Sequence, residues 1–275
     1  MNPIQCRPLK TLDEFAAVVE LERHVWGPEY IDVVPVPILA VTAQRGGILI
    51  GAFDGDRMVG FVYSLAAIKD GKSTQWSHML GVVDEHRNTG LGHRLKLLQR
   101  ECALEMGLDL MEWTFDPMQA ANAHLNFSKL GVLVEEYELN AYGESASPLH
   151  GGNPTDRFVA EWLLRSPRVE RRIAALEDFA ARVADLTAAR PVNRASGTGE
   201  WFDCRDVDLS LDAPHLTVEI PTGFTDMLSR ARDLALAWRM ATREMFLTYF
   251  ARGYRAVDFF LNRPARTGKY LMTRV

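Results

Sequence analysis

The stretch that decides the fold is Val82-Val83-Asp84-Glu85-His86-Arg87-Asn88-Thr89-Gly90-Leu91-Gly92. It follows an apolar run and precedes a helical pattern, in which apolar residues recur every three or four positions: Leu91, Leu95, Leu98, Cys102 and Met106. Gly90 and Gly92 let a ligand approach the backbone because they carry no Cβ. The N–H groups of the first helical turn lack intrahelical partners, so Arg87-x-x-Gly90-x-Gly92 predicts an anion site suited to a pyrophosphate. A glycine-rich turn without a ligand is the alternative.

The residues before this loop predict a strand, two helices and a three-stranded meander. Thr11 and Glu14 form a capping-box pattern at the start of the first helix, which ends near Trp26. Asp54-Gly55 between two apolar runs predicts a hairpin. The expected strands are 5–9, 47–53, 58–66 and 74–83, and the expected second helix is 35–44.

The residues after the loop predict further helices and strands in alternation. Gly107 closes the helix that the loop begins, and Gly131 closes another. The expected elements are a strand at 108–115, a helix at 117–130 and a strand at 132–140. Ser166-Pro167 predicts the start of one long helix with a buried stripe of Val169, Ile173, Leu176, Ala180 and Val183. The stretch 189–204 is aperiodic, and a strand (216–220), a helix (234–249) and a strand (254–261) follow it.

A short internal repeat links two of these regions. Residues 127–140 parallel residues 249–262, with an aromatic residue, a glycine (Gly131 and Gly253), an acid, an aromatic residue, a leucine and an asparagine at equal offsets. Two unrelated helix–glycine–strand units would also look alike, so both interpretations stay open.

The loop and the element order resemble the GNAT family of acyl-CoA-dependent N-acyltransferases over residues 4–145. The phosphate loop of that family reads R/Q-x-x-G-x-G/A between a strand and a helix, which Arg87 to Gly92 matches. The resemblance implies an α/β (α+β) fold with a mixed, mostly antiparallel sheet and flanking helices. We expect a GNAT catalytic domain at 1–150, a connecting helix and linker at 151–204, and a smaller, degenerate GNAT-like half at 205–275 without a CoA site of its own.

The same resemblance implies acyl-CoA as co-substrate and an amine that attacks it directly in a ternary complex. The pantetheine would lie where strands 75–83 and 108–115 separate, with the acyl carbonyl polarised by a backbone amide near Leu80 to Val82. The residues expected to bind CoA are Leu80, Val82, Val83, Arg87, Asn88, Thr89, Gly90, Leu91 and Gly92, together with Asn122 and Asn126, which would share one helical face. Local capping or solvent contact is the alternative for the two asparagines.

Catalysis by such an enzyme needs a base that takes a proton from the ammonium group of the acceptor. It sometimes also needs an acid that protonates the departing CoA thiolate. His78 is the first candidate base, because it would share a strand face with Leu80 and Val82 and because histidine has an ordinary pKa of about 6.5. It lies where serotonin N-acetyltransferase, another GNAT enzyme, places an active-site histidine. A structural histidine is the alternative, and Glu112 and Asp116 are other candidate bases. Phe127 stands where many GNAT enzymes carry a tyrosine acid, which leaves Tyr142 as a candidate acid.

A finer resemblance is to a branch of the family that includes succinyl-CoA-dependent N-succinyltransferases of amino acids. It is carried by Ser77-His78-Met79-Leu80-Gly81-Val82, Trp113-Thr114-Phe115-Asp116-Pro117, Asp156-Arg157 and Ala237-Trp238-Arg239-x-Ala241-Thr242-Arg243-Glu244. The GNAT resemblance also places Trp26, Glu22 and Tyr30 in the first-helix region that covers acceptors. Arg157, Arg239 and Arg243 are candidates for carboxylate binding, because guanidinium groups match carboxylates bidentately. A core tryptophan and solvated surface arginines are the alternatives.

The composition of the chain disfavours several other classes of protein. The chain has 275 residues, 47% hydrophobic and 24% charged, and a net charge of −5, which disfavours nonspecific nucleic-acid binding. Three distant cysteines without a CxxC pair favour a reducing, cytoplasmic setting, and seven scattered histidines predict no metal site. No apolar run is long enough for a membrane. The expected partner is a small-molecule amine, and a homodimer is left open. The competing function is a degenerate GNAT protein that binds CoA or a metabolite without catalysis.

Overall fold

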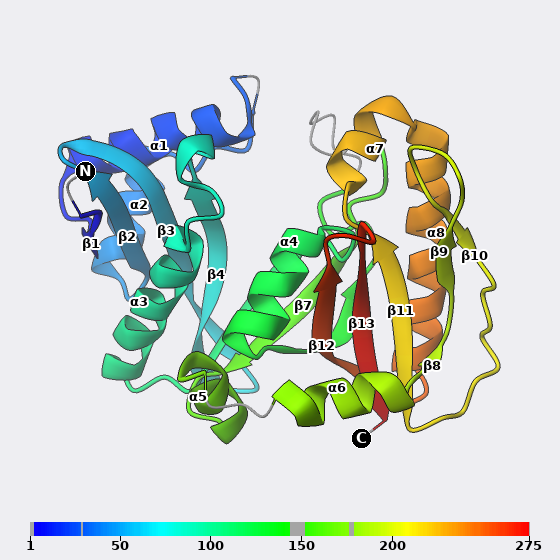
Figure 1. Ribbon diagram of the computed structural model, residues 1–275. Helices are drawn as coiled ribbons and strands as arrows, with labels where there is room; N and C mark the ends of the chain where they lie inside the picture. Colours follow the sequence, from blue (N-terminus) through cyan, green and yellow to red (C-terminus); the bar gives the residue numbers. More distant parts are fainter. Residues whose placement is uncertain (1–2, 29, 144–151, 176–178, 275) are drawn as a thin grey trace. The chain divides into compact units, whose positions relative to one another are not determined.

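The computed structural model describes residues 3–28, 30–143, 152–175 and 179–274. The chain forms two compact units, of which unit 1 comprises residues 1–113 and 163–165, and unit 2 comprises 114–162 and 166–275. Both units combine strands, most of them antiparallel, with flanking helices, as Figure 1 shows. The predicted fold class, a mixed and mostly antiparallel sheet with flanking helices, is confirmed. No helix in the described ranges is long and apolar enough to span a bilayer.

Unit 1 is built around five strands in the order β1-β2-β3-β4-β5. Its elements are β1 (Gln5–Pro8), α1 (Leu12–Trp26), α2 (Val36–Gln44), β2 (Ile48–Asp54), β3 (Arg57–Lys69), β4 (Lys72–Val82), the 3₁₀ turn η1 (Asp84–His86), α3 (Leu91–Glu105) and most of β5 (Leu110–Phe115). β1 to β4 pair antiparallel, and β4 pairs parallel with β5. Helix α3 is the crossover that a parallel pair requires.

Local signals set the boundaries of these elements. The hydroxyl of Thr11 accepts a hydrogen bond from Glu14 N (3.2 Å), and the Glu14 carboxylate accepts one from Thr11 N (3.0 Å), so the predicted capping box is present. Gly55 lies in the two-residue turn closed by the pair Asp54 and Arg57, with φ of +59°, as hairpin geometry requires. Gly107 follows α3 in a left-handed conformation, φ +76°.

Strand β4 contains a β-bulge at His78, which the sequence did not predict. Tyr63 of β3 pairs with Met79, whereas the next residue, Ser64, pairs with Ser77, so His78 is the extra residue on β4. An extra residue shifts the alternation of side chains between the two faces of a sheet. The bulge therefore decides which side chains of β4 face α3 and which face α1 and α2.

Unit 2 contains six strands in the order β7-β6-β12-β13-β11-β8, and a separate hairpin β9-β10. Its elements are α4 (Ala120–Ala123), the π-helix η2 (His124–Leu130), β6 (Leu133–Glu138), β7 (Arg157–Leu163), α5 (Pro167–Ile173), α6 (Phe179–Ala188), β8 (Arg190–Pro191), β9 (Arg194–Ser196), β10 (Asp203–Arg205), β11 (His215–Pro221), α7 (Phe224–Arg230), α8 (Arg232–Phe250), β12 (Tyr254–Asn262) and β13 (Thr267–Arg274). Phe158 is the centre of an aromatic core, with Phe115, Tyr137, Phe246 and Tyr270 around it at ring distances of 4.6–5.7 Å.

The internal repeat has a structural counterpart in unit 2. Gly131 and Gly253 both end a helix in a left-handed conformation and precede β6 and β12. These two strands pair antiparallel at Val134 and Ala256, each three residues after its glycine. Equivalent residues thus face each other across a local two-fold axis, and β7-β6 is mirrored by β12-β13. The chain order β11–α7/α8–β12–β13 repeats β5–α4/η2–β6–β7, and unit 2, which begins at Thr114, contains most of both copies.

Three expectations about secondary structure are wrong. The helix predicted from Ser166 is two helices, because Ala175 adopts φ of +52° after α5, although Ser166 does cap α5. In the predicted stripe, Val169 is buried but Ala180 is exposed, and Leu176 lies outside the described residues. β7, α7 and β13 were not predicted, and the aperiodic stretch 189–204 contains β8, β9 and the first residues of β10.

Candidate functional site

The loop between β4 and α3 has the geometry of an anion site. Gly90 is the N-cap of α3, with φ +91° and ψ −1°, a left-handed conformation that favours glycine. Asn88 is also left-handed, with φ +61°. An ideal Cβ on Gly90 meets no atom within 4 Å, so the space beside the turn is open. Leu91 is buried and anchors the helix start against the unit.

The first turn of α3 has nothing of its own chain that competes with an anion. No side chain caps its N-terminus, and no acidic residue occurs in the turn. The first intrahelical bond runs from Arg94 N to Gly90 O (3.0 Å), so the N–H groups before Arg94 point toward the loop. Together with the helix dipole, these N–H groups favour a phosphate oxygen.

Side chains in the loop stabilise its backbone rather than cover it. Arg87 donates from Nε to Val82 O (3.1 Å) and pairs with Asp84 (2.7 Å). The Thr89 hydroxyl donates to His86 O (2.7 Å), and Val83 N donates to Val59 O (3.0 Å). Leu80 Cδ2 lies 3.7 Å from the Cβ position of Gly92. The predicted CoA-loop residues of unit 1 thus converge on one strand-to-helix junction.

β4 and β5 pair over a short distance only. Their parallel register consists of Gln75 with Met111 and Trp76 with Glu112. From Ser77 onward β4 pairs with β3 alone in the described part of the chain. Residues 77–82 thus leave one edge of β4 with N–H and C=O groups that another extended chain could pair with.

His78 lies at the start of this open edge, but not on the predicted face. The bulge turns its ring toward Tyr63, with ring centroids 5.8 Å apart at 83°. Leu80 lies against Gly92 of α3, and Val82 lies with Leu95 beside Gly60. The expectation that His78, Leu80 and Val82 share one face is therefore wrong. His78 is exposed, and partial burial of its ring lowers its pKa below 6.5, so the imidazole is neutral at pH 7 and able to accept a proton.

Glu112 lies on β5 and pairs in register with Trp76, two residues from His78. Its carboxylate is buried and forms an ion pair with Lys69 Nζ at 2.5 Å. Trp26, the predicted acceptor contact, ends α1 with its ring edge-on to Phe61 (6.1 Å) and near Tyr30 (5.6 Å). The structure thus places His78, Glu112 and Trp26 in unit 1, with the first two close together.

Two buried ionisable side chains of unit 1 were not predicted as catalytic residues, although one of them, Glu22, lies in the predicted acceptor region. Glu22 of α1 is fully buried and accepts a hydrogen bond from Val34 N (2.8 Å). Burial raises the pKa of Glu22 to about 7, against the opposing effects of this hydrogen bond and of Arg23. Lys96 of α3 is also buried, donates to Ser77 Oγ and Gln99 Oε1 (both 2.9 Å), and lies 3.6 Å from the Trp113 ring centroid. Burial lowers the pKa of Lys96 well below 10.5.

The asparagines and the tyrosine predicted for the site lie in unit 2. Asn122 is exposed in α4 and Asn126 is buried in η2, so they do not share one equally accessible face. The reason is that the helix changes to π-type hydrogen bonding at His124. Tyr142 is 52% exposed, its hydroxyl lies 2.8 Å from Thr114 Oγ1, and Arg157 lies over its ring at 5.1 Å.

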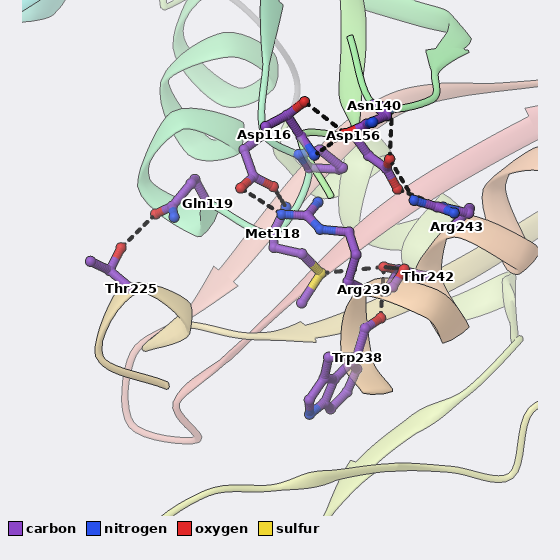
Figure 2. A network of polar contacts seen from close by, with 12 residues as sticks. Asp116, Met118, Gln119, Asn140, Asp156, Thr225, Trp238, Arg239, Thr242 and Arg243 are labelled. Atoms are coloured by element: carbon purple, nitrogen blue, oxygen red, sulfur yellow. Dashed lines mark hydrogen bonds and ion pairs between the residues drawn. The ribbon is translucent and has the colours of Figure 1, made fainter. Parts of the chain in front are cut away.

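The three arginines predicted to bind carboxylates all lie in unit 2, and Figure 2 shows Arg239 and Arg243 of this set. Arg239 donates from Nη2 to Asp116 Oδ2 (2.7 Å), and Arg243 binds Asp156 through Nε and Nη2 (both 2.8 Å). Burial would raise the pKa of Asp116, but the charge and hydrogen bond of Arg239, with the charge of Arg157, hold it below its usual value. An arginine-paired Asp116 of this kind makes a poor proton acceptor.

The sequence holds a second match to the loop pattern, which the sequence analysis missed. Arg194-Ala195-Ser196-Gly197-Thr198-Gly199 lies between β8 and β11 of the second half. Here the arginine begins the hairpin β9-β10, in which Arg194 pairs with Arg205, and no helix follows the glycines. Without a helix N-terminus, this segment lacks the convergent N–H groups that the first loop has.

In the described ranges, no three histidine, cysteine, aspartate or glutamate side chains gather in a way that could hold a metal ion. Cys6, Cys102 and Cys204 are free thiols.

Among known proteins, the chain is similar to solved structures. No family model matches the chain, and no curated protein matches it. A GNAT-family acetyltransferase from Streptococcus pneumoniae has 16% identity and a TM-score of 0.47, covering 58% of this chain and 98% of its own. The ribosomal-protein-S18-alanine N-acetyltransferase of Escherichia coli has 14% identity and a TM-score of 0.48, covering 60% and 96%. The yncA protein of Salmonella typhimurium, solved with acetyl-CoA, has 16% identity and a TM-score of 0.49, covering 60% and 96%. The function proposed below rests on this chain's own residues.

Proposed function

We propose that the chain is a cytoplasmic acyl-CoA-dependent N-acyltransferase that acts on a primary amine of a small molecule. The observation that carries this proposal is the junction of β4 and α3, where Gly90 opens a helix whose first-turn N–H groups are uncapped. A pyrophosphate would bind there, and the pantetheine would pair with the open edge of β4 at residues 77–82. CoA is the common ligand that carries both groups.

Direct attack of the amine on the thioester would require few protein groups. A neutral His78 would take the proton from the ammonium, directly or through water, and a backbone N–H of Leu80 to Val82 would polarise the carbonyl. Glu112 is a weaker candidate, since Lys69 occupies its carboxylate. Tyr142, which the resemblance nominates as an acid, and Asn122 and Asn126, which it nominates as CoA contacts, lie in unit 2.

The finer proposal is succinyl-CoA as donor and the α-amine of an amino acid as acceptor, with Trp26 as an acceptor contact. Both substrates carry a carboxylate, and a buried carboxylate needs cationic or N–H partners. The convergence of Arg157, Arg239 and Arg243 in unit 2 supports a carboxylate-bearing substrate.

The competing function, CoA or metabolite binding without catalysis, is favoured by Phe127. This residue is fully buried in the aromatic core and has no group that could donate a proton. His78 argues for catalysis, because its imidazole is exposed, neutral and next to the open edge of β4.

Calorimetry with CoA and a thiol-release assay separate the two functions. The catalytic proposal expects CoA binding and release of free thiol when acyl-CoA is mixed with an amine panel. The panel should contain amino acids and amines without a carboxylate, each with acetyl-CoA and succinyl-CoA. CoA binding without any thiol release across the panel would establish the binding-protein alternative, and no CoA binding would refute both.

A further inference from the structure

Arg239 has donor groups that its own surroundings do not use. The residue is 2% exposed, and its one hydrogen bond runs from Nη2 to Asp116. Its Nε and Nη1 atoms are buried and have no hydrogen-bond partner among the described residues. A buried charged donor without a partner is costly, which makes such a pair of atoms unusual in a folded interior.

The neighbouring Arg243 belongs to the same network (Figure 2), but its guanidinium group is paired differently. Its Nε and Nη2 both bind Asp156, whose remaining capacity is taken by the Tyr137 hydroxyl (2.8 Å) and Asn140 N (3.0 Å). This arrangement is a closed structural ion pair. Unlike Arg239, Arg243 has no buried donor atom without a partner among the described residues.

Arg157 lies near the same carboxylate. The charges of Arg239 and Arg157 both act on Asp116, and Arg157 also lies opposite Glu138 in the pairing of β7 with β6. Tyr137 and Tyr270 add no charge, since burial raises the pKa of both phenols and keeps them neutral. Arg157 Nε is another buried atom without a partner in the described part, while the Arg157 residue itself is partly exposed.

We infer that Arg239 and Arg157 form a binding site in unit 2 for one carboxylate of a small organic acid, next to Asp116. A carboxylate oxygen accepts from an unused N–H group of Arg239 and from Arg157, and the positive charges of the two guanidinium groups favour it. Asp116 holds Arg239 in place from the other side. The carboxylate belongs to an acyl donor or to an amine acceptor. Only this identity rests on the proposed function.

The test measures carboxylate binding to the full chain without CoA, so its outcome is independent of the acyltransfer proposal. Succinate and acetate are titrated at constant ionic strength, with chloride as the reference anion, and binding is followed by calorimetry and thermal unfolding. The wild type is expected to show saturable binding of one carboxylate beyond the chloride reference. Arg239→Lys keeps the charge and one bond to Asp116 but lacks the other donors, so at least a tenfold loss of affinity is expected. Arg230→Lys, the same change at an exposed arginine of unit 2, should bind as the wild type does.

Asp116→Asn gives a second test in the opposite direction. It removes a negative charge beside the site, so carboxylate affinity should rise, whereas a merely structural Arg239–Asp116 pair predicts no gain. If Arg239→Lys fails to fold, this variant and Arg157→Gln, for which weaker binding is expected, decide the question. Absence of saturable binding in the wild type, equal affinity in folded Arg239→Lys, or unchanged or weaker affinity in Asp116→Asn would overturn the inference.

Discussion

Substitution of Gly90 by alanine tests the phosphate loop most directly. The residue adopts φ +91°, a region in which an L-residue costs about 1–2 kcal/mol. Its Cβ would meet no protein atom within 4 Å, so this backbone strain is the whole expected effect on the fold. Gly90→Ala should therefore lower the free energy of unfolding by about 1–2 kcal/mol and leave a folded protein.

The effect on CoA should be larger than the effect on stability. If the strain is relieved by rotation of the turn, at least one first-turn N–H no longer meets the pyrophosphate. A hydrogen bond to a charged group contributes about 1.5–3 kcal/mol, which corresponds to a loss of roughly tenfold to more than a hundredfold in affinity. Isothermal calorimetry with CoA measures this loss, and chemical denaturation measures the stability of the same sample.

Gly92→Ala is the matched control. Gly92 lies in the first turn of α3 without a positive φ, and a Cβ there would lie 3.7 Å from Leu80, an ordinary contact. Alanine favours helix over glycine by up to about 1 kcal/mol, and the loop pattern admits alanine here, so this variant should be slightly more stable and still bind CoA. Unchanged CoA affinity in a folded Gly90→Ala protein would show that the pyrophosphate does not bind at this turn.

The remaining predictions concern the base, a buried acid and the core. His78→Ala should lower kcat by about 10²–10⁴ while CoA affinity measured by calorimetry stays unchanged; a pH–rate profile identical to that of the wild type would exclude His78 as the base. Glu22 has a pKa raised from 4.5 to about 7, so the folded state holds its proton more tightly, and the free energy of unfolding should fall as pH rises from 4.5 to 7. Glu22→Gln should flatten this decline in denaturant titrations across that window, whereas an identical slope would contradict the assignment. Phe158→Ala should lower the free energy of unfolding by about 3–5 kcal/mol, because Phe158 is fully buried. A loss under 1 kcal/mol in chemical denaturation would mean that the aromatic core rearranges to fill the space.

The sequence predicted unit 1 well because its elements carry local signals. The capping box at Thr11 and the hairpin at Asp54-Gly55 are short-range patterns, and both are present. β7 was missed because residues 158–160 are consecutively buried, so no alternation marks the strand. The bulge at His78 could not be predicted from β4 alone, because a bulge is a property of the pairing between two strands.

The loop of the candidate site was readable from one contiguous stretch, whereas the arginine network was not. Asp116, Asp156 and Arg239 come from three distant segments, and only the folded unit shows which donors each carboxylate occupies. The sequence nominated Arg239 and Arg243 alike, but only Arg239 of the two has buried donor atoms without a partner among the described residues. Glu22 was nominated only by its place in the first helix, and Lys96 gave no signal, because a single charged residue in an amphipathic helix is ordinarily solvated.

The pairing of Val134 with Ala256 limits how the chain can be divided. β6 obtains one of its two neighbours from β12, a strand near the other end of the sequence. A fragment that stops after residue 150 would contain β6 but neither β7 nor β12, and both edges of β6 would be exposed. Such edges recruit other strands, so the fragment should aggregate rather than behave as an isolated catalytic domain. On the ribosome, the same strand has to wait for most of the chain before its sheet is complete, which favours a dependence on chaperones during synthesis.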